Sequence, residues 1–231
     1  MKTLLASVTV LTASLLGAYD VKTVELVPVK FQKTPSHAPV KMIENGKLNF
    51  AIVADLKAEA RMQYKNRTQK SIEPAIEIIK EAVEKCTGIT PQVLDIKNAV
   101  QAKYMIVVGD NAITRKNGID VTKLPTQGLA VKTFEKGIIV AGNDSSLIAG
   151  YNTKPLENRG SSFGTKYGVY DFVERFLGVR YYFPGEYGTL WPEIKNLTLT
   201  PVSYTDAPYF NDRNGIFYLG DSIHSPRGKQ F

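Results

Sequence analysis

The chain has 231 residues, of which 43% are hydrophobic and 22% are charged, and its formal net charge is +7. This composition is typical of a globular protein with a buried core. The basic residues are spread along the whole chain, so the charge predicts a solvated surface and no nucleic-acid partner.

The single cysteine, Cys86, excludes a disulfide framework and any metal site built from several cysteines. It falls on the apolar stripe of a predicted helix, which favours a buried small hydrophobic side chain. A catalytic thiol would need a histidine partner, and the two histidines, His37 and His224, lie in a polar N-terminal segment and near the C-terminus. A Cys–His pair is therefore not expected.

Residues 1–18 have the pattern of a secretory signal peptide. Lys2 supplies a positive start, an apolar run of small residues follows, and Gly17-Ala18 offers a small-residue exit. The run is shorter than the roughly 20 apolar residues that span a bilayer. We therefore expect an exported, periplasmic or extracellular protein that meets the membrane only through this signal. A buried N-terminal helix or an uncleaved anchor is the alternative.

Residues 19–47 contain three prolines and no sustained hydrophobic period, which indicates a lead-in segment with a candidate short strand at residues 24–31. Residues 48–54 are a compact apolar run that predicts the first strand of an α/β accessory domain spanning residues 48–202. Residues 57–70 are polar and basic, and we interpret them as a loop or a short surface helix.

Two helices are predicted from apolar stripes at three- and four-residue steps. The first covers residues 71–86, with Ser71 as its N-cap and Gly88 as its stop. The second covers residues 163–177 and ends at Gly178. Three of the predicted strands lie between them.

Further strands are expected at residues 104–108, 129–134, 137–141, 179–183 and 197–200, and the second and third of these form a hairpin. Residues 147–162 are rich in Gly, Asn and Ser and are interpreted as a loop. This order has too few crossover helices for a long parallel sheet. We predict an α+β fold with a mixed, mostly antiparallel sheet of about five strands and two principal helices packed on it.

Two strand ends carry polar sequences that could suggest phosphate loops, Gly109-Asp110-Asn111 and Gly142-Asn143-Asp144. Neither continues as the glycine-rich loop that opens a nucleotide-binding helix, so turns are predicted and no cofactor is expected. Asp171 and Glu174 lie on one helix, whereas the two carboxylates of a glycosidase face each other across the substrate. We interpret both as ion-pair residues. Their expected partners are Lys166, Arg175 and Arg180.

The stretch after the second helix is rich in aromatic residues: Tyr181, Tyr182, Phe183, Tyr187 and Trp191. Alternation along a strand favours core positions for those within residues 179–183. Tyr187 and Trp191 lie in a loop containing Pro and Gly. They are therefore candidates for contact with a sugar or a neighbouring domain.

Four pieces of this region follow one another in a recognisable order: Tyr170-Asp171-Phe172-Val173-Glu174, Leu177-Gly178-Val179-Arg180-Tyr181-Tyr182, Pro184-Gly185-Glu186 and Trp191-Pro192. The combination resembles the segment that closes the small α/β domain in front of the catalytic barrel of α-glucuronidases and β-hexosaminidases, and of related uncharacterised, mostly bacterial secreted proteins. The resemblance covers about residues 48–216. It implies a fold like the second domain of the hexosaminidases.

Residues 203–231 are expected to be a linker and the start of a truncated catalytic barrel. Asp206-Ala207-Pro208-Tyr209-Phe210 and Arg213-Asn214-Gly215-Ile216 resemble the junction at which β-hexosaminidases begin the first barrel strand. There the arginine binds hydroxyls of the terminal sugar, which implies a substrate-binding role for Arg213. Asn214 departs from the glycine that directly follows in the family, so a plain surface arginine is the alternative.

The resemblance implies a non-catalytic N-terminal domain of an exported glycoside-hydrolase-like protein that acts in polysaccharide or glycoconjugate degradation. A barrel needs roughly 200 further residues, so the catalytic carboxylates of such a family are not expected in this chain. Carbohydrate would be the partner, through the missing barrel. The candidate substrate-binding residues are Tyr187, Trp191 and Arg213, and no metal site is expected.

Two alternatives stay open. One is a stand-alone secreted module that binds a carbohydrate or a protein through its aromatic loop. The other is an autonomous enzyme with acidic residues at strand ends, where sites of α/β proteins gather. Those residues are Asp55, Asp110 and Asp144.

Overall fold

A computed structural model describes residues 29–57, 61–64, 67–70, 72–144, 146–148, 159–161 and 163–208. The predicted signal peptide, the proposed cap Ser71 and the candidate residue Arg213 lie outside these ranges. Among the residues that the structure describes, no helix combines the length and the apolar character needed to cross a membrane.

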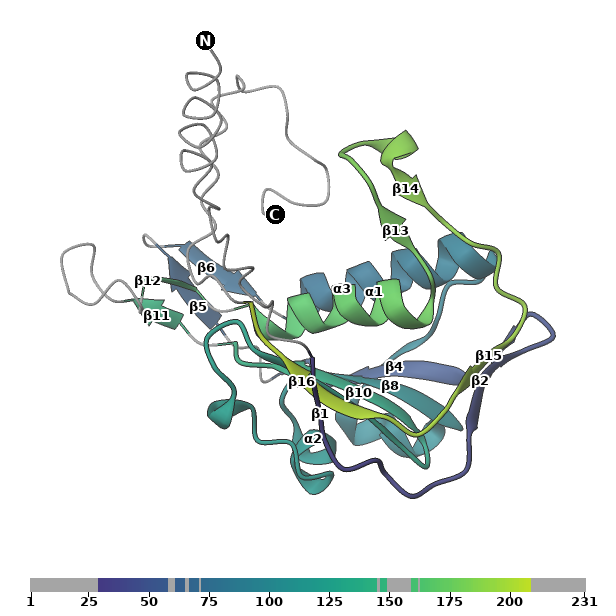
Figure 1. The fold of residues 1–231 in the computed structure, drawn as a ribbon, viewed down its shortest axis with the longest axis horizontal. Coiled ribbons are helices and arrows are strands. Elements are labelled where there is room, and N and C mark those ends of the chain that lie inside the picture. Colours follow the sequence, from purple (N-terminus) through teal and green to yellow (C-terminus); the bar gives the residue numbers. More distant parts are fainter. Residues whose placement is uncertain are drawn as a thin grey trace, which may run out of the picture.

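A seven-stranded sheet forms the centre of the molecule (Figure 1), in the order β1-β16-β9-β10-β8-β4-β7. In that order the strands are Lys30–Phe31, Ser203–Asp206, Leu129–Phe134, Gly137–Gly142, Tyr104–Val108, Phe50–Ala54 and Val93–Asp95. The four strands from β10 to β7 are parallel, and the four from β1 to β10 pair antiparallel. The predicted α+β class is confirmed, but the sheet is larger than five strands and only half of its pairings are antiparallel.

Helices cover both faces of this sheet, so the central strands are buried on both sides. The long helices α1 (Ile72–Thr87) and α3 (Gly164–Phe176) lie on one face (Figure 1). Ile52, Ile106 and Ile138 belong to the core beneath them. The next residue along each strand, Val53, Val107 and Ile139, belongs to a second core on the opposite face. That face carries the short helices η1 (Ile96–Gln101), α2 (Ala112–Lys116) and η2 (Val121–Lys123).

The two long helices match their predictions to within one residue at each end. Gly88 and Gly178 follow them with φ of +75° and +72°, the left-handed conformation that ends a helix without a Cβ penalty. The predicted hairpin is the pair β9–β10. Within the described part of the predicted strand at residues 24–31, β1 covers Lys30–Phe31.

Small sheets surround the central one. β2 (Val40–Glu44) pairs with β15 (Leu197–Leu199) and β3 (Lys47–Leu48). β5 (Arg61–Tyr64) pairs with β6 (Arg67–Lys70), so the prediction of a loop or surface helix at residues 57–70 is wrong. β11 (Ser146–Ile148) pairs with β12 (Arg159–Ser161), so the loop predicted at residues 147–162 carries strand at both described ends. β6 has no apolar residue, so its backbone pairing with β5 defines it as a strand.

The end of β10 meets the start of α3 backbone to backbone. A Cβ built on Gly142 would lie 2.0 Å from the carbonyl carbon of Gly164. The Gly142 amide donates to Thr165 Oγ1 at 3.0 Å, and the Thr165 amide donates to the Asp144 carboxylate at 3.0 Å. Glycine at both positions therefore sets how closely α3 lies on the sheet.

Replacing Gly142 by alanine should destabilise the protein by about 2–4 kcal/mol, because the new methyl group overlaps backbone that cannot move aside. Gly118→Ala is the matched control, since its Cβ meets no atom within 4 Å although its φ is +79°. That control should lose only about 1 kcal/mol. Urea unfolding measures both, and equal losses would show that the close approach is not the constraint.

Candidate functional site

The carboxyl ends of the parallel strands bring acidic residues to one edge of the sheet. Asp55 follows β4, Asp95 ends β7, Asp110 follows β8 and Asp144 follows β10. The chain continues from β4 towards α1 on one face and from β8 towards α2 on the other. Such a switch point is where open α/β sheets bind ligands. This edge therefore has to be tested first as a catalytic site.

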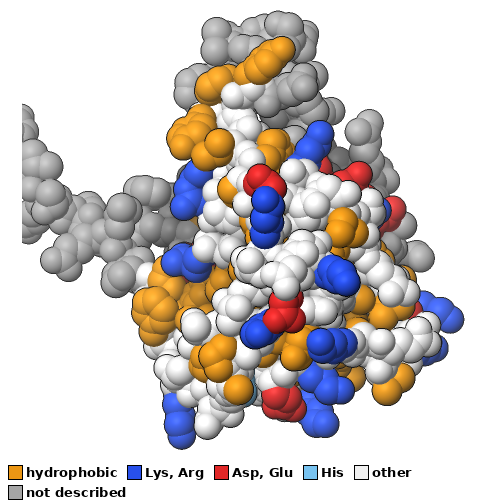
Figure 2. Space-filling model, turned by 90° about the vertical axis from the view of Figure 1, so that its right-hand side faces the viewer, with side chains coloured by type: hydrophobic (Ala, Val, Ile, Leu, Met, Phe, Trp, Pro, Cys, Tyr) orange, Lys and Arg blue, Asp and Glu red, His pale blue; other side chains and the backbone are white. Residues whose placement is uncertain are grey.

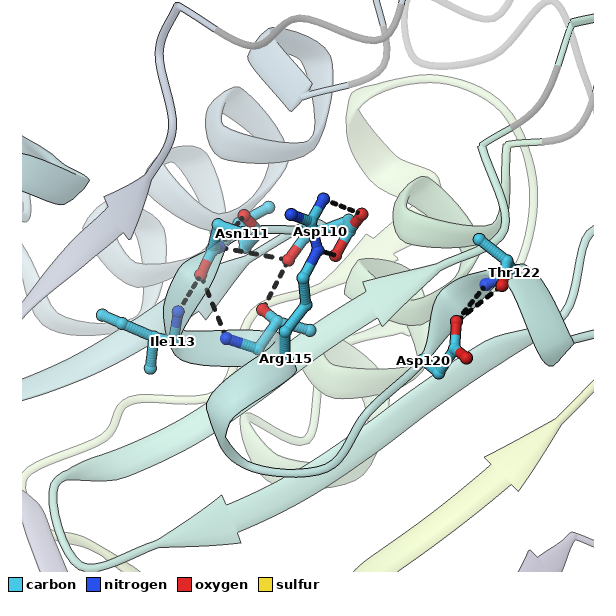
Figure 3. Close-up of polar contacts among 9 residues, drawn as sticks. Asp110, Asn111, Ile113, Arg115, Asp120 and Thr122 are labelled. Carbon is cyan, nitrogen blue, oxygen red and sulfur yellow. Dashed lines mark hydrogen bonds and ion pairs between the residues drawn. The ribbon is translucent and has the colours of Figure 1, made fainter.

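The acids at this edge are engaged in local structure. Arg115 donates to both oxygens of Asp110, from Nη2 at 2.7 Å and from Nε at 3.0 Å (Figure 3). Asp95 accepts the amides of Lys97 at 3.0 Å and Leu56 at 3.3 Å. Asp144 caps α3 and Asp55 accepts the Lys57 amide at 3.1 Å. These contacts hold turns and helix starts, which is the work of structural carboxylates.

Asn111 explains the turn after β8. Its side chain is 3% exposed, and its Oδ1 accepts the amides of Ile113 at 3.0 Å and Thr114 at 3.1 Å (Figure 3). Its Nδ2 donates to the carbonyl oxygens of Val108 and Gly109. An anion bound at the start of this helix would need these two backbone amides as its donors. The predicted turn is confirmed, and the donors of a phosphate loop are already used.

Asp120 repeats this capping pattern at the start of η2. Its Oδ1 accepts the Thr122 amide at 3.1 Å and the Thr122 hydroxyl at 2.6 Å (Figure 3). These hydrogen bonds, together with Lys123, lower the pKa of Asp120. Among the described residues, no group of three or more His, Cys, Asp or Glu is placed to hold a metal ion.

Cys86 is buried, as its position on the helix stripe predicted, with 2% of the residue exposed. Burial raises the pKa of its thiol to about 11. The reactive form of cysteine is the thiolate, so this thiol is unreactive at neutral pH. His37 is engaged elsewhere, with Nε2 3.0 Å from Thr133 Oγ1 and Nδ1 2.8 Å from the Ala38 carbonyl oxygen.

Asn111→Ala should destabilise the protein by about 2–3 kcal/mol, because it removes a buried cap and leaves the amides of Ile113 and Thr114 without their side-chain acceptor. Asp120→Ala removes a comparable but exposed cap and should lose about 1 kcal/mol or less. Chemical denaturation of the two variants measures the difference. A loss at Asn111 no larger than at Asp120 would contradict the structural assignment of this turn.

An aromatic hairpin stands away from the body of the molecule at the far end of α3 (Figure 1). It consists of β13 (Arg180–Tyr181), η4 (Glu186–Gly188) and β14 (Thr189–Leu190). Its exposed large side chains are Tyr182 at 70%, Phe183 at 59%, Tyr187 at 92% and Leu190 at 52%. In Figure 2, hydrophobic side chains gather along the upper end of the molecule, where Figure 1 places this hairpin. The exposure of Tyr182 and Phe183 was not predicted from the sequence.

The base of the aromatic hairpin is anchored to α3 by ring contacts. Tyr181 lies edge-on to Tyr170, with ring centroids 5.6 Å apart, and edge-on to Trp191 at 6.2 Å. Trp191 is partly buried against the main core. The expectation of core positions throughout residues 179–183 is wrong for Tyr182 and Phe183, because β13 ends at Tyr181 and the chain leaves the sheet there. Of the candidate residues, the structure therefore places Tyr187 at the hairpin tip and Trp191 at its base.

Asp171 connects α3 to β16. Its carboxylate accepts from Arg175 Nη2 at 2.9 Å and from the Tyr204 hydroxyl. The Arg175 guanidinium lies 5.0 Å from the centre of the Tyr204 ring. The predicted ion pair between Asp171 and Arg175 is confirmed. Arg180 donates to the backbone carbonyl oxygen of Glu174 at 2.6 Å. Sequence reasoning missed Tyr204, since no local pattern links residues 33 positions apart.

Burial and the hydrogen bond to Asp171 raise the pKa of Tyr204 above its ordinary value of about 10. Above pH 10 the unfolded chain loses this proton while the folded chain keeps it, so this contribution to stability is present below pH 10 and decreases as pH rises. Tyr204→Phe should lose about 1–2 kcal/mol at pH 8 and should reduce the decline above pH 10.

Tyr187→Phe, the same change at a ring that is 92% exposed, is the control for the other tyrosines. Unfolding free energies of both variants are measured between pH 8 and pH 11. The difference between their slopes should approach about 1.4 kcal/mol per pH unit. Identical slopes would rule out a buried, protonated Tyr204.

Comparison with known proteins gives a distant structural similarity. No family model matches this chain, and no curated protein matches it. The chain is similar to the crystal structure of beta-N-acetylhexosaminidase from Bacteroides fragilis NCTC 9343, with 15% identity and a TM-score of 0.36. The match covers 78% of this chain and 22% of that one, so this chain spans about a fifth of that protein's length. The similarity is too distant to assign a family.

Proposed function

We propose that this chain is a non-catalytic N-terminal domain of an exported glycoside-hydrolase-like protein that acts in polysaccharide or glycoconjugate degradation. The proposal that the domain is non-catalytic rests on the hydrogen bonds of the acidic residues at the strand ends. Asp55, Asp95, Asp110 and Asp144 accept hydrogen bonds that fix turns and helix starts. An autonomous enzyme at this edge would need a nucleophile, a base and a stabilising group held toward a substrate.

The sequence resemblance supports the domain type. In the structure, Leu177 and Val179 are buried in the main core, and Gly178 between them ends α3. Arg180 donates to the carbonyl oxygens of Glu174 and Val179. The resembling residues therefore build the connection from α3 to the aromatic hairpin. The roles of these residues are structural, so the resemblance supports the type of domain. The proposal of sugar binding rests on other residues.

A stand-alone secreted module that binds a carbohydrate or a protein is the second candidate. The observation that favours it is the exposure of Tyr182, Phe183 and Tyr187 on one projecting hairpin. Under either function we propose that Tyr187, Trp191 and Arg213 contact the substrate. Export is proposed from residues 1–18, and carbohydrate is the proposed partner.

The full chain should not hydrolyse chromogenic aryl-glycosides, including an aryl N-acetylglucosaminide and an aryl glucuronide. Asp110→Asn should lower stability, because it weakens the pairing with Arg115, and should leave the zero rate unchanged. Release of the chromophore is followed by absorbance beside a β-hexosaminidase as positive control. Turnover by the wild type that disappears in a folded Asp110→Asn variant would overturn the non-catalytic assignment.

Sequencing the source genome beyond the codon for Phe231 separates the two candidates. A reading frame that continues for roughly 200 residues or more would fit a following barrel. A stop codon at that point would favour the stand-alone module.

A further inference from the structure

Four large side chains of the aromatic hairpin lie outside both hydrophobic cores. Tyr182, Phe183, Tyr187 and Leu190 are each more than half exposed. With their areas scaled by exposure, they present roughly 500 Å² of largely apolar surface. Their combined area lies in the range of the largest apolar patches on soluble monomers, which are often functional.

The hairpin presents these side chains on fixed backbone. Arg180 pairs with Leu190 and Tyr181 with Thr189 at its base. The Tyr182 amide donates to the Gly188 carbonyl oxygen at 2.8 Å near its tip. The edge-on contacts of Tyr181 hold this unit against α3. A rigid support lowers the entropy lost on binding.

The chemistry of the surface favours a neutral ligand. From Tyr181 to Pro192, Glu186 is the only charged residue, in a chain that is 22% charged. Arg180, at the base, is occupied by two carbonyl oxygens. Tyrosine offers an apolar ring face and a hydroxyl together. A sugar ring offers the matching pair, a face of C–H groups with hydroxyls around its edge.

The size of the surface argues against a protein partner. Stable protein–protein interfaces bury about 800 Å² on each side. The patch of roughly 500 Å² falls below that value. It is sufficient for a few consecutive sugars of an extended chain, each contacting one ring.

We propose that the aromatic hairpin binds a neutral polysaccharide, with Tyr182 and Tyr187 stacking on sugar rings. Phe183 and Leu190 supply apolar contact beside them. This inference rests on the proposed carbohydrate-related function and names the ligand class of that function. It also moves the binding surface to the projecting tip, with Tyr182 as a residue that sequence reasoning had assigned to the core.

Affinity electrophoresis of the full chain tests the proposal. The gels contain hydroxyethylcellulose, mixed-linkage β-glucan or galactomannan as neutral probes, and polygalacturonate as the anionic probe. At least one neutral polymer should retard the wild type more than polygalacturonate does. Tyr187→Ala and Tyr182→Ala should each weaken binding roughly two- to ten-fold, the range for loss of one aromatic contact. Tyr187→Trp should retain it.

Phe31→Ala is the matched control, because Phe31 is 70% exposed on β1. It should bind like the wild type. All variants should melt within a few degrees of the wild type, since the changes are on exposed side chains. Absence of retardation by all three neutral polymers, or equal weakening by Phe31→Ala, would overturn the proposal.

Light scattering over a concentration series tests the competing occupant. Dimerisation of the wild type that Tyr187→Ala abolishes would make the hairpin a protein interface and overturn the proposal. These experiments measure binding and association, so they are independent of the hydrolysis assay. Turnover of an aryl-glycoside would refute the non-catalytic function and leave polysaccharide binding standing, and the reverse also holds.

Discussion

Direct backbone contact between Gly142 and Gly164 sets the position of α3, and the rest of the described structure depends on that position. At its start, α3 is held to β10 by Thr165 and Asp144. Along its length, Asp171 reaches across to Tyr204 on β16. Near its middle, about 9 Å from its start, Tyr170 contacts Tyr181 of the aromatic hairpin. The position of this exposed surface therefore depends on a contact between two glycines at the start of the same helix.

At the sheet edge where many α/β proteins bind ligands, the acidic residues of this chain take part in local structure. Its carboxylates neutralise the start of a helix, pair with a neighbouring arginine or close a turn. Asp55 and Asp110 bond to residues within five positions in the sequence. Asp144, after β10, bonds to the first turn of α3. The carboxylates are thereby held by nearby amides or by a neighbouring arginine. The aromatic hairpin differs from this edge, because Glu186 is the only charged residue between Tyr181 and Pro192.

Sequence reasoning succeeded where the deciding interactions are local. The stripes of α1 and α3, the stops at Gly88 and Gly178, and the β9–β10 hairpin follow from spacing alone. It failed where a distant partner decides. β6 has no apolar residue and β5 has only two alternating ones, and the two strands pair with each other. Tyr182 and Phe183 have strand-like composition but no sheet to join, and Tyr204 finds Asp171 only in three dimensions. The share of parallel strands was underestimated because η1 and α2 are too short to show as crossover helices.

The pairing of β1 with β16 has a mechanical consequence. Lys30 lies opposite Thr205, so the chain enters the described fold beside the point where it leaves. Tension applied between these two points would act across the pair and separate it one hydrogen bond after another, because the load never falls on all of its bonds together. β1 has only two residues, so it would detach at low force, and the load would then pass to β16 and its pairing with β9. A force applied through both ends of the described fold would thus act first on the pairing of β1 with β16. The two helices and the parallel strands would not bear that first load.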